Sequence, residues 1–128
     1  MVVVGGEVVG SGYNRREVDA DPLSHAELKA IGEASSKLRS WRLSEATLYV
    51  TLEPCTMCAG ALIQARLGRL VFGAMDPKAG AVGSLYNLLK DDRLNHQVEV
   101  KGGVLEMECG KVLTDFFVAL RGRKKTRE

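Results

Sequence analysis

The spacing of hydrophobic residues changes between strand-like and helix-like repeats along the first half of the chain. Two valine-rich runs, residues 2–4 and 7–9, flank Gly5-Gly6, and a glycine pair between such runs is typical of a two-residue β-hairpin. Residues 25–38 carry apolar side chains at helical spacing, and residues 47–51 form a short strand-like run. The chain is therefore predicted to begin with a hairpin, followed by a helix and a strand.

The alternation of strand and helix continues through the middle of the chain. A helix is predicted for residues 56–66 and a strand for residues 69–74, which we expect to pair in parallel with the strand at 47–51. Three further elements complete the expected order: a short helix near 85–89, a strand at 97–101 and a helix at 105–121. This order is typical of a layered α/β domain.

The length and composition indicate one compact domain. With 128 residues, of which 45% are apolar, the chain is long enough for one core and too short for two. We expect a single domain over residues 1–128, with a basic tail at about 121–128. The three cysteines, an odd number, favour a reducing compartment. Since neither a signal peptide nor a membrane-length apolar run is present, the expected location is the cytoplasm, with no membrane partner.

Positive charge is concentrated at the end of the chain. Residues 121–128 carry a net charge of +4, whereas the preceding 120 residues carry −2. Such a basic segment suits contact with nucleic-acid phosphates, although a solvated tail explains the composition equally well. The candidate contacts are Arg121, Arg123, Lys124 and Lys125. Phe116 could stack on a base, but an aromatic pair in an amphipathic helix is more often core, so at least one of Phe116 and Phe117 should be buried.

Candidate chemistry lies in two short motifs, His25-Ala26-Glu27 and Pro54-Cys55-Thr56-Met57-Cys58. One imidazole and two thiolates are a ligand set that leaves the fourth position of a tetrahedral zinc ion open for water. Such water can ionise near neutral pH, and Glu27 is placed to carry its proton. Either motif alone is weak evidence, but P-C-x-x-C arises by chance in roughly one chain per thousand of this length, and its combination with H-x-E indicates a catalytic zinc site.

The spacing of the two motifs predicts where they lie on helices. Residues two apart in a helix interior point about 200° apart, so His25 and Glu27 can face one metal only from a first helical turn. Ser24 is the expected N-cap of that helix. Cys55 begins a second helix, whose N-terminal amides and dipole favour the thiolate forms of both cysteines. Two helix N-termini are therefore expected to converge on one ion.

The pairing of H-x-E with a downstream P-C-x-x-C is the signature of zinc-dependent nucleobase deaminases. Longer segments resemble the bacterial tRNA-specific adenosine deaminases: TLYVTLEPCTMCAGALI at 47–63, VFGAMDPKAGA at 71–81 and LTDFF at 113–117. The resemblance covers nearly the whole chain. It implies an α/β fold of three layers, α/β/α, of the cytidine-deaminase type with a mixed central sheet.

The resemblance also implies a role for individual residues. His25, Cys55 and Cys58 would hold one Zn²⁺ per subunit, with Glu27 as the proton shuttle. Asn14 matches an asparagine that hydrogen-bonds the target nucleoside, although an asparagine after a glycine-rich stretch is equally a turn former. The backbone of Ala26 would contact the base. Asp76 matches an aspartate near the target ribose, which would favour RNA, although a solvated loop carboxylate is an equal explanation.

The reaction implied by this family is hydrolytic deamination of adenosine to inosine in tRNA, at the wobble position of the anticodon, by a homodimer. Two alternatives share the motifs. One is deamination of a free base or nucleotide, such as cytosine, guanine or a pyrimidine intermediate, because the metal chemistry is the same. The other is an inactive zinc-containing RNA-binding subunit, which the intact Glu27 disfavours.

The start of the chain departs from the family pattern. The bacterial family normally begins with an additional helix before the first strand, whereas this chain starts inside that strand. Without the N-terminal helix, we expect apolar surface to be exposed on one face of the sheet unless the last helix or another subunit covers it.

Overall fold

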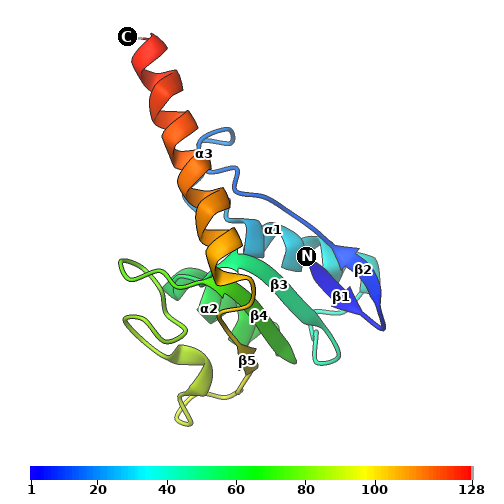
Figure 1. The fold of residues 1–128 in the computed structure, drawn as a ribbon. Coiled ribbons are helices and arrows are strands. Elements are labelled where there is room, and N and C mark those ends of the chain that lie inside the picture. The colour runs from blue at the N-terminus through cyan, green and yellow to red at the C-terminus, as the bar shows by residue number, and fades with distance from the viewer. Residues whose placement is uncertain (128) are drawn as a thin grey trace.

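A mixed five-stranded sheet forms the centre of the molecule. The computed structural model describes the backbone of residues 1–127 and the side chains of residues 1–119. The strand order is β2 (Glu7–Gly10), β1 (Val2–Val4), β3 (Thr47–Leu52), β4 (Arg69–Ala74), β5 (Glu99–Lys101). β1 is antiparallel to β2 and β3, whereas β3, β4 and β5 run parallel (Figure 1). The predicted hairpin at Gly5-Gly6 and the predicted parallel pair are both present.

The register of the two central strands places the site at one edge of the sheet. Leu48 lies opposite Leu70, and Leu52 lies opposite Ala74, so β3 and β4 end together. Leu48 and Leu70 are buried against the helices, while Tyr49, the next residue along β3, faces the other side and is exposed. The chain segments that follow both strands therefore emerge at the same edge.

Helices lie on both faces of the sheet. α1 (Ala26–Leu38) and α2 (Thr56–Gln64) cover one face, and α3 (Glu106–Arg127) starts on the other and then extends away from the body (Figure 1). The main core forms between the sheet and the first two helices from Ala30, Ala34, Leu48, Leu62, Ile63, Leu70 and Phe72. This arrangement matches the expected three-layer α/β/α fold. Among the described residues, no helix combines the length and the apolar character needed to cross a membrane.

Several elements differ from the expected bounds, and α2 ends at Gln64, two residues earlier than expected. The short helix expected near 85–89 is a 3₁₀ turn, η1 (Leu88–Lys90). β5 begins at residue 99, two residues later than expected. The last helix continues to residue 127 instead of 121: it runs through Gly122, and no proline follows that would stop it.

The expectation that Phe116 or Phe117 is buried is wrong. Their exposed fractions are 56% and 48%. The two rings contact each other edge to face, with centroids 5.5 Å apart. The reason is that this part of α3 has already passed beyond the sheet, so the rest of the chain does not pack over it (Figure 1).

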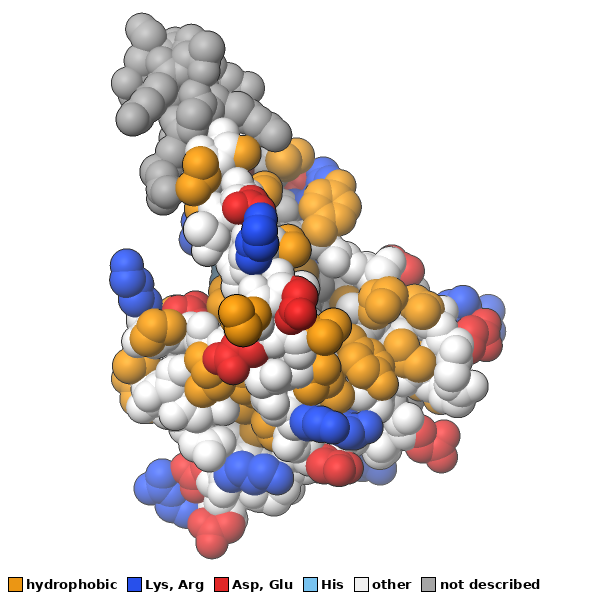
Figure 2. Space-filling model, viewed as in Figure 1, with side chains coloured by type: hydrophobic (Ala, Val, Ile, Leu, Met, Phe, Trp, Pro, Cys, Tyr) orange, Lys and Arg blue, Asp and Glu red, His pale blue; other side chains and the backbone are white. Residues whose placement is uncertain are grey.

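Apolar side chains are exposed on the α3 side of the sheet, as Figure 2 shows. The exposed large apolar residues on β3 and α3 and just before α3 are Tyr49, Leu105, Met107, Val112, Phe116, Phe117 and Val118. A cavity of about 390 Å³ lies between the sheet and the start of α3, with Thr51, Gly73 and Cys109 in its wall. The sequence predicts exposed apolar surface on one face of the sheet without specifying which, and the structure has such surface on the α3 side.

We predict that Gly10→Ala destabilises the fold. A methyl group at Gly10 would overlap the carbonyl oxygen of Ala30 and lie 2.9 Å from the backbone nitrogen of Ala34, so β2 would have to move away from α1. Overpacking of this kind costs about 1–3 kcal/mol in the free energy of unfolding. The control is Gly32→Ala. Gly32 is exposed on α1, and a methyl group added there would have no atom within 4 Å. This variant should gain about 0.5–1 kcal/mol in the free energy of unfolding. Thermal melts that moved in the same direction for both variants would contradict this account.

Candidate functional site

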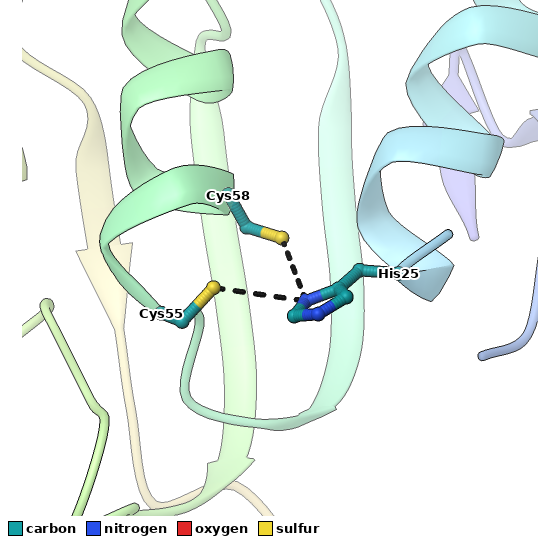
Figure 3. Close-up of side chains that lie close together, drawn as sticks. All are labelled: His25, Cys55 and Cys58. Carbon is teal, nitrogen blue, oxygen red and sulfur yellow. Dashed lines mark hydrogen bonds between the residues drawn. The ribbon is translucent and has the colours of Figure 1, made fainter. Parts of the chain in front are cut away.

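The candidate metal ligands lie at the starts of two helices. His25 immediately precedes α1, Cys55 immediately precedes α2, and Cys58 lies in the first turn of α2. The Nδ1 atom of His25 is 3.6 Å from the Sγ atom of Cys55 and 3.5 Å from the Sγ atom of Cys58 (Figure 3). The fold thus brings together residues that are up to 33 positions apart in the sequence.

These separations fit a tetrahedral zinc ion. Zn–N and Zn–S bonds of about 2.0 and 2.3 Å at the tetrahedral angle place nitrogen and sulfur about 3.5 Å apart. The ligand atoms of the group all lie within 4.8 Å of one another, so one ion can reach the three of them. One imidazole and two thiolates leave a fourth position for water, which is the arrangement of catalytic zinc sites.

The position of the cysteine pair depends on the turn that follows β3. Pro54 is fully buried, and its carbonyl oxygen accepts a hydrogen bond of 2.9 Å from the backbone N–H of Ala81. Cys55 pairs with Gly80 in an isolated antiparallel bridge. The segment after β4 therefore holds the turn from which both cysteines project.

The Cys58 thiol needs a cation to ionise. Its exposed fraction is 0%, and burial raises its pKa well above the usual range, with the Glu27 carboxyl and the Cys55 sulfur adding to the effect. The N-terminus of α2 favours the thiolate, and burial and these two neighbours act against it in the metal-free chain. A divalent cation between the ligands supplies the missing charge, so thiolate formation and metal binding are coupled.

Glu27 lies in the first turn of α1 beside the metal group. Its carboxyl interacts with the Cys58 thiol and contributes to the raised pKa of that group. Glu27 and Ala26 also line the 390 Å³ cavity that reaches Thr51 and Gly73. Since none of the three candidate ligands lines this cavity, the case for Glu27 as a proton carrier rests on its half-buried position beside the Cys58 thiol.

Asn14 is a turn former in this structure. Its Oδ1 atom accepts a hydrogen bond of 2.9 Å from the backbone N–H of Arg16, and its side chain is exposed. The backbone N–H of Arg15 donates to the carbonyl oxygen of Ser24, 2.9 Å away. The loop that carries Asn14 is therefore closed against the residue that precedes His25.

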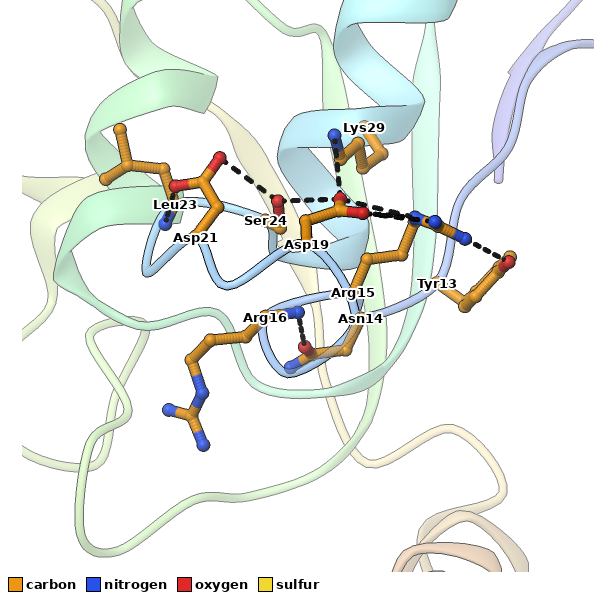
Figure 4. Close-up of polar contacts among 9 residues, drawn as sticks. All are labelled: Tyr13, Asn14, Arg15, Arg16, Asp19, Asp21, Leu23, Ser24 and Lys29. Atoms are coloured by element: carbon orange, nitrogen blue, oxygen red, sulfur yellow. Dashed lines mark hydrogen bonds and ion pairs between the residues drawn. The ribbon is translucent and has the colours of Figure 1, made fainter.

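Ser24 does not cap α1, contrary to the sequence-based expectation. Its hydroxyl oxygen lies 3.1 Å from Asp19 and 3.2 Å from Asp21 (Figure 4), while His25 is the N-cap residue and makes no side-chain capping bond. The reason is competition, since two carboxylates of the preceding loop take the hydroxyl. Asp19 also binds Arg15 at 3.0 Å and Lys29 at 3.6 Å, and the Arg15 guanidinium holds the pKa of Asp19 below its usual value.

Asp76 lies on the segment after β4, half-buried. Its Oδ1 atom accepts hydrogen bonds from the backbone N–H groups of Lys78 and Ala79, at 3.1 and 3.2 Å. Its own backbone N–H donates to the Oε1 atom of Glu53, 2.9 Å away. Sequence reasoning missed Glu53, although a carboxylate at the end of an apolar strand, directly before Pro54, is an unusual feature.

The carboxyl group of Glu53 is ionised despite its burial. Burial alone raises its pKa, but the Ser84 hydroxyl and the backbone N–H groups of Asp76, Ser84 and Val82 act in the opposite direction, and the pKa is lowered overall. The group is therefore negatively charged at neutral pH.

The candidate RNA contacts lie on α3. Phe116 is exposed on α3, the helix that extends away from the body (Figure 1). The backbone of Arg121, Arg123, Lys124 and Lys125 continues this helix, but their side chains lie outside the described residues. The structure therefore gives the basic residues a helical backbone and an exposed aromatic neighbour.

Comparison with known proteins adds a family and two solved structures. The family model of the MafB19-like deaminases matches residues 1–121. A tRNA-specific adenosine deaminase from Bacillus subtilis (strain 168) is 52% identical over 125 residues, which are 98% of this chain and 78% of the relative.

A solved structure from a study of A-to-I editing by tRNA:A34 deaminases at the wobble position of transfer RNA superposes with a TM-score of 0.82. It is 41% identical and covers 87% of this chain and 80% of the other. A guanine deaminase from Nitrosomonas europaea, with a TM-score of 0.70 and 24% identity over 82% of this chain and 63% of the other, shares the fold.

Proposed function

Because this chain belongs to the tRNA-specific adenosine deaminases, within the MafB19-like deaminase family, we propose that it deaminates adenosine to inosine at the wobble position of a tRNA anticodon, with one zinc ion held by His25, Cys55 and Cys58. The observation that carries the proposal is the spacing of the Nδ1 and Sγ atoms, 3.5 and 3.6 Å, which suits a three-ligand zinc site. When bound, zinc lowers the pKa of a coordinated water and so supplies a nucleophile near neutral pH.

Glu27 carries the protons of this reaction. Its carboxylate accepts a proton from water as the new C6–O bond forms, and passes that proton to N1 of adenine. It then helps the exocyclic amine to leave as ammonia when the C6–N bond breaks. The contact of Glu27 with the Cys58 thiol supports this role.

Three residues around this centre are proposed substrate contacts. Asn14 donates a hydrogen bond from its side-chain amide to the nucleoside, the backbone of Ala26 contacts the base, and the carboxylate of Asp76 contacts the ribose. The 2′-hydroxyl, which only RNA offers, is then part of recognition. Bases in an anticodon loop are already exposed, so the reaction avoids most of the unstacking cost of a few kcal/mol that a duplex imposes.

The remaining proposals concern the setting of this site. We propose that residues 1–128 act as a single domain and that the enzyme works in the cytoplasm, where tRNA is modified. The RNA contacts that we propose are the exposed Phe116 and the basic residues Arg121, Arg123, Lys124 and Lys125.

We also propose a homodimer. Light scattering at micromolar concentration should give the mass of two chains, and an active species with the mass of one chain would refute the dimer.

The proposed substrate is tested by incubating the zinc-loaded protein with a panel of tRNAs and reading adenosine-to-inosine changes by sequencing. We expect inosine at the first anticodon position of a tRNA that has adenosine there, and also in the isolated anticodon stem–loop. Free adenosine, cytosine and guanine serve as comparison substrates. Efficient release of ammonia from a free base, without inosine in any tRNA, would replace the proposal with a free-base deaminase. Zinc binding without deamination of any substrate would indicate an inactive RNA-binding subunit.

A further inference from the structure

Glu53 is a buried carboxylate that the proposed reaction does not use. It follows β3, directly before Pro54 and Cys55, and only 2% of its surface is exposed. Among the side chains of residues 1–119, none of the lysines or arginines forms an ion pair with it. Burying a charge without a cation is costly unless hydrogen bonds compensate. Glu53 therefore requires a structural explanation.

Four hydrogen bonds from one segment satisfy this carboxylate. The Oε1 atom accepts from the backbone N–H of Asp76 at 2.9 Å and from the hydroxyl of Ser84 at 2.5 Å. The Oε2 atom accepts from the backbone N–H groups of Val82 at 2.9 Å and Ser84 at 3.0 Å. Every one of these donors lies between residues 76 and 84. Residues 76–84 therefore wrap around the carboxylate of Glu53, and these hydrogen bonds determine the path of the segment.

The same segment contacts the turn that carries the metal ligands. It binds Pro54 through the N–H of Ala81 and pairs Gly80 with Cys55. Gly80 packs so closely on Glu53 that a methyl group there would overlap the carboxylate. At the start of the segment, the Asp76 side chain is oriented by backbone N–H groups of the segment itself. A displacement of the segment therefore moves Asp76 relative to Cys55.

We propose that Glu53 is a positioning residue that fixes residues 76–84 beside the metal ligands and thereby sets the position of Asp76 toward the target nucleotide. This inference rests on the proposed function, in which Asp76 contacts the substrate. Glutamine has the shape of glutamate, but its NH₂ group would face N–H donors in place of one acceptor oxygen. At least one backbone N–H of the segment then loses its acceptor, and the segment shifts.

The test is a pair of double-mutant cycles on an anticodon stem–loop RNA. Glu53→Gln should retain one zinc ion per chain and raise KM by roughly tenfold, the size of coupling found between contacting groups, with little change in kcat. The double variant Glu53→Gln/Asp76→Ala should lose no more kcat/KM than Asp76→Ala alone. Combined with Asn14→Ala, which changes a substrate contact on a different loop, the two losses in kcat/KM should multiply.

A merely structural role predicts a different pattern. If Glu53→Gln only lowered the fraction of folded enzyme, kcat per chain would fall, KM would stay constant, and the losses would multiply with both partners. That result would overturn the proposal. If the wild-type chain left the stem–loop unchanged, the proposed function itself would fail, which is a separate outcome of the same assay.

Two further variants decide the matter if Glu53→Gln does not fold. Ser84→Ala removes one of the four hydrogen bonds and keeps the carboxylate, so it should raise KM by a smaller factor. Gly80→Ala displaces the carboxylate by a steric clash without removing any donor. A raised KM in both, coupled to Asp76→Ala and independent of Asn14→Ala, supports the proposal. An unchanged KM in both refutes it.

Discussion

Replacing Glu27 with glutamine is expected to lower kcat for adenosine deamination by about 10²–10⁴-fold while zinc remains bound. Glutamine keeps the size of the side chain but neither accepts the proton of water nor returns it to N1 of adenine. The carboxyl group is not a member of the ligand set, which consists of one imidazole and two sulfur atoms. Inosine formation under single-turnover conditions and zinc content by mass spectrometry measure the two effects separately.

Glu33→Gln is the matched control for this variant. Glu33 lies on the same helix, α1, and carries the same charge, but it is exposed and outside the wall of the cavity. Its substitution should leave kcat and zinc content unchanged. If Glu27→Gln retained the full rate, another group would have to carry the protons.

Cys58→Ala is expected to abolish zinc binding, and activity with it. Two ligands remain after the substitution, which are too few to hold the ion. A bound ion would also join the starts of α1 and α2, so its loss should lower the stability of the fold. The melting temperature of the wild-type protein should therefore fall when a chelator removes zinc. The melting temperature of Cys58→Ala should be low from the outset and insensitive to the chelator.

The third cysteine provides the control. Cys109 lies on α3 against Gly73 and does not belong to the metal group. Cys109→Ala should therefore bind one zinc ion per chain and respond to the chelator as the wild type does. A Cys58→Ala protein that still held one ion per chain would show that other residues form the site.

Local pattern was sufficient for most of the fold. The glycine pair at residues 5–6 marks a hairpin because two-residue turns need positive φ, and both glycines have it, at 57° and 78°. The helix expected for residues 25–38 appears as α1 (Ala26–Leu38), since its apolar spacing suits burial on a sheet. The candidate metal ligands could be proposed for a similar reason, because their spacing is a feature of short sequence motifs.

Features that depend on partners far away in the sequence could not be predicted from local pattern. The apolar positions of α3 predict a face that is covered, but they carry no information on whether the sheet extends under Phe116. Ser24 has the residue type of an N-cap, yet Asp19 and Asp21 compete for its hydroxyl in three dimensions. The donors of Glu53 lie 23 to 31 residues away along the chain, so its role becomes visible only in the folded structure.

The origin of the metal ligands in two helices also determines when a zinc site can exist during folding. His25 and Cys55 are 30 positions apart, so the helix starts that carry them come together only in the folded chain. An unfolded chain offers no preformed group of three ligands. We therefore expect zinc to bind only after α1 and α2 have packed together, so that the amount of bound metal reports how much of the newly made protein has folded.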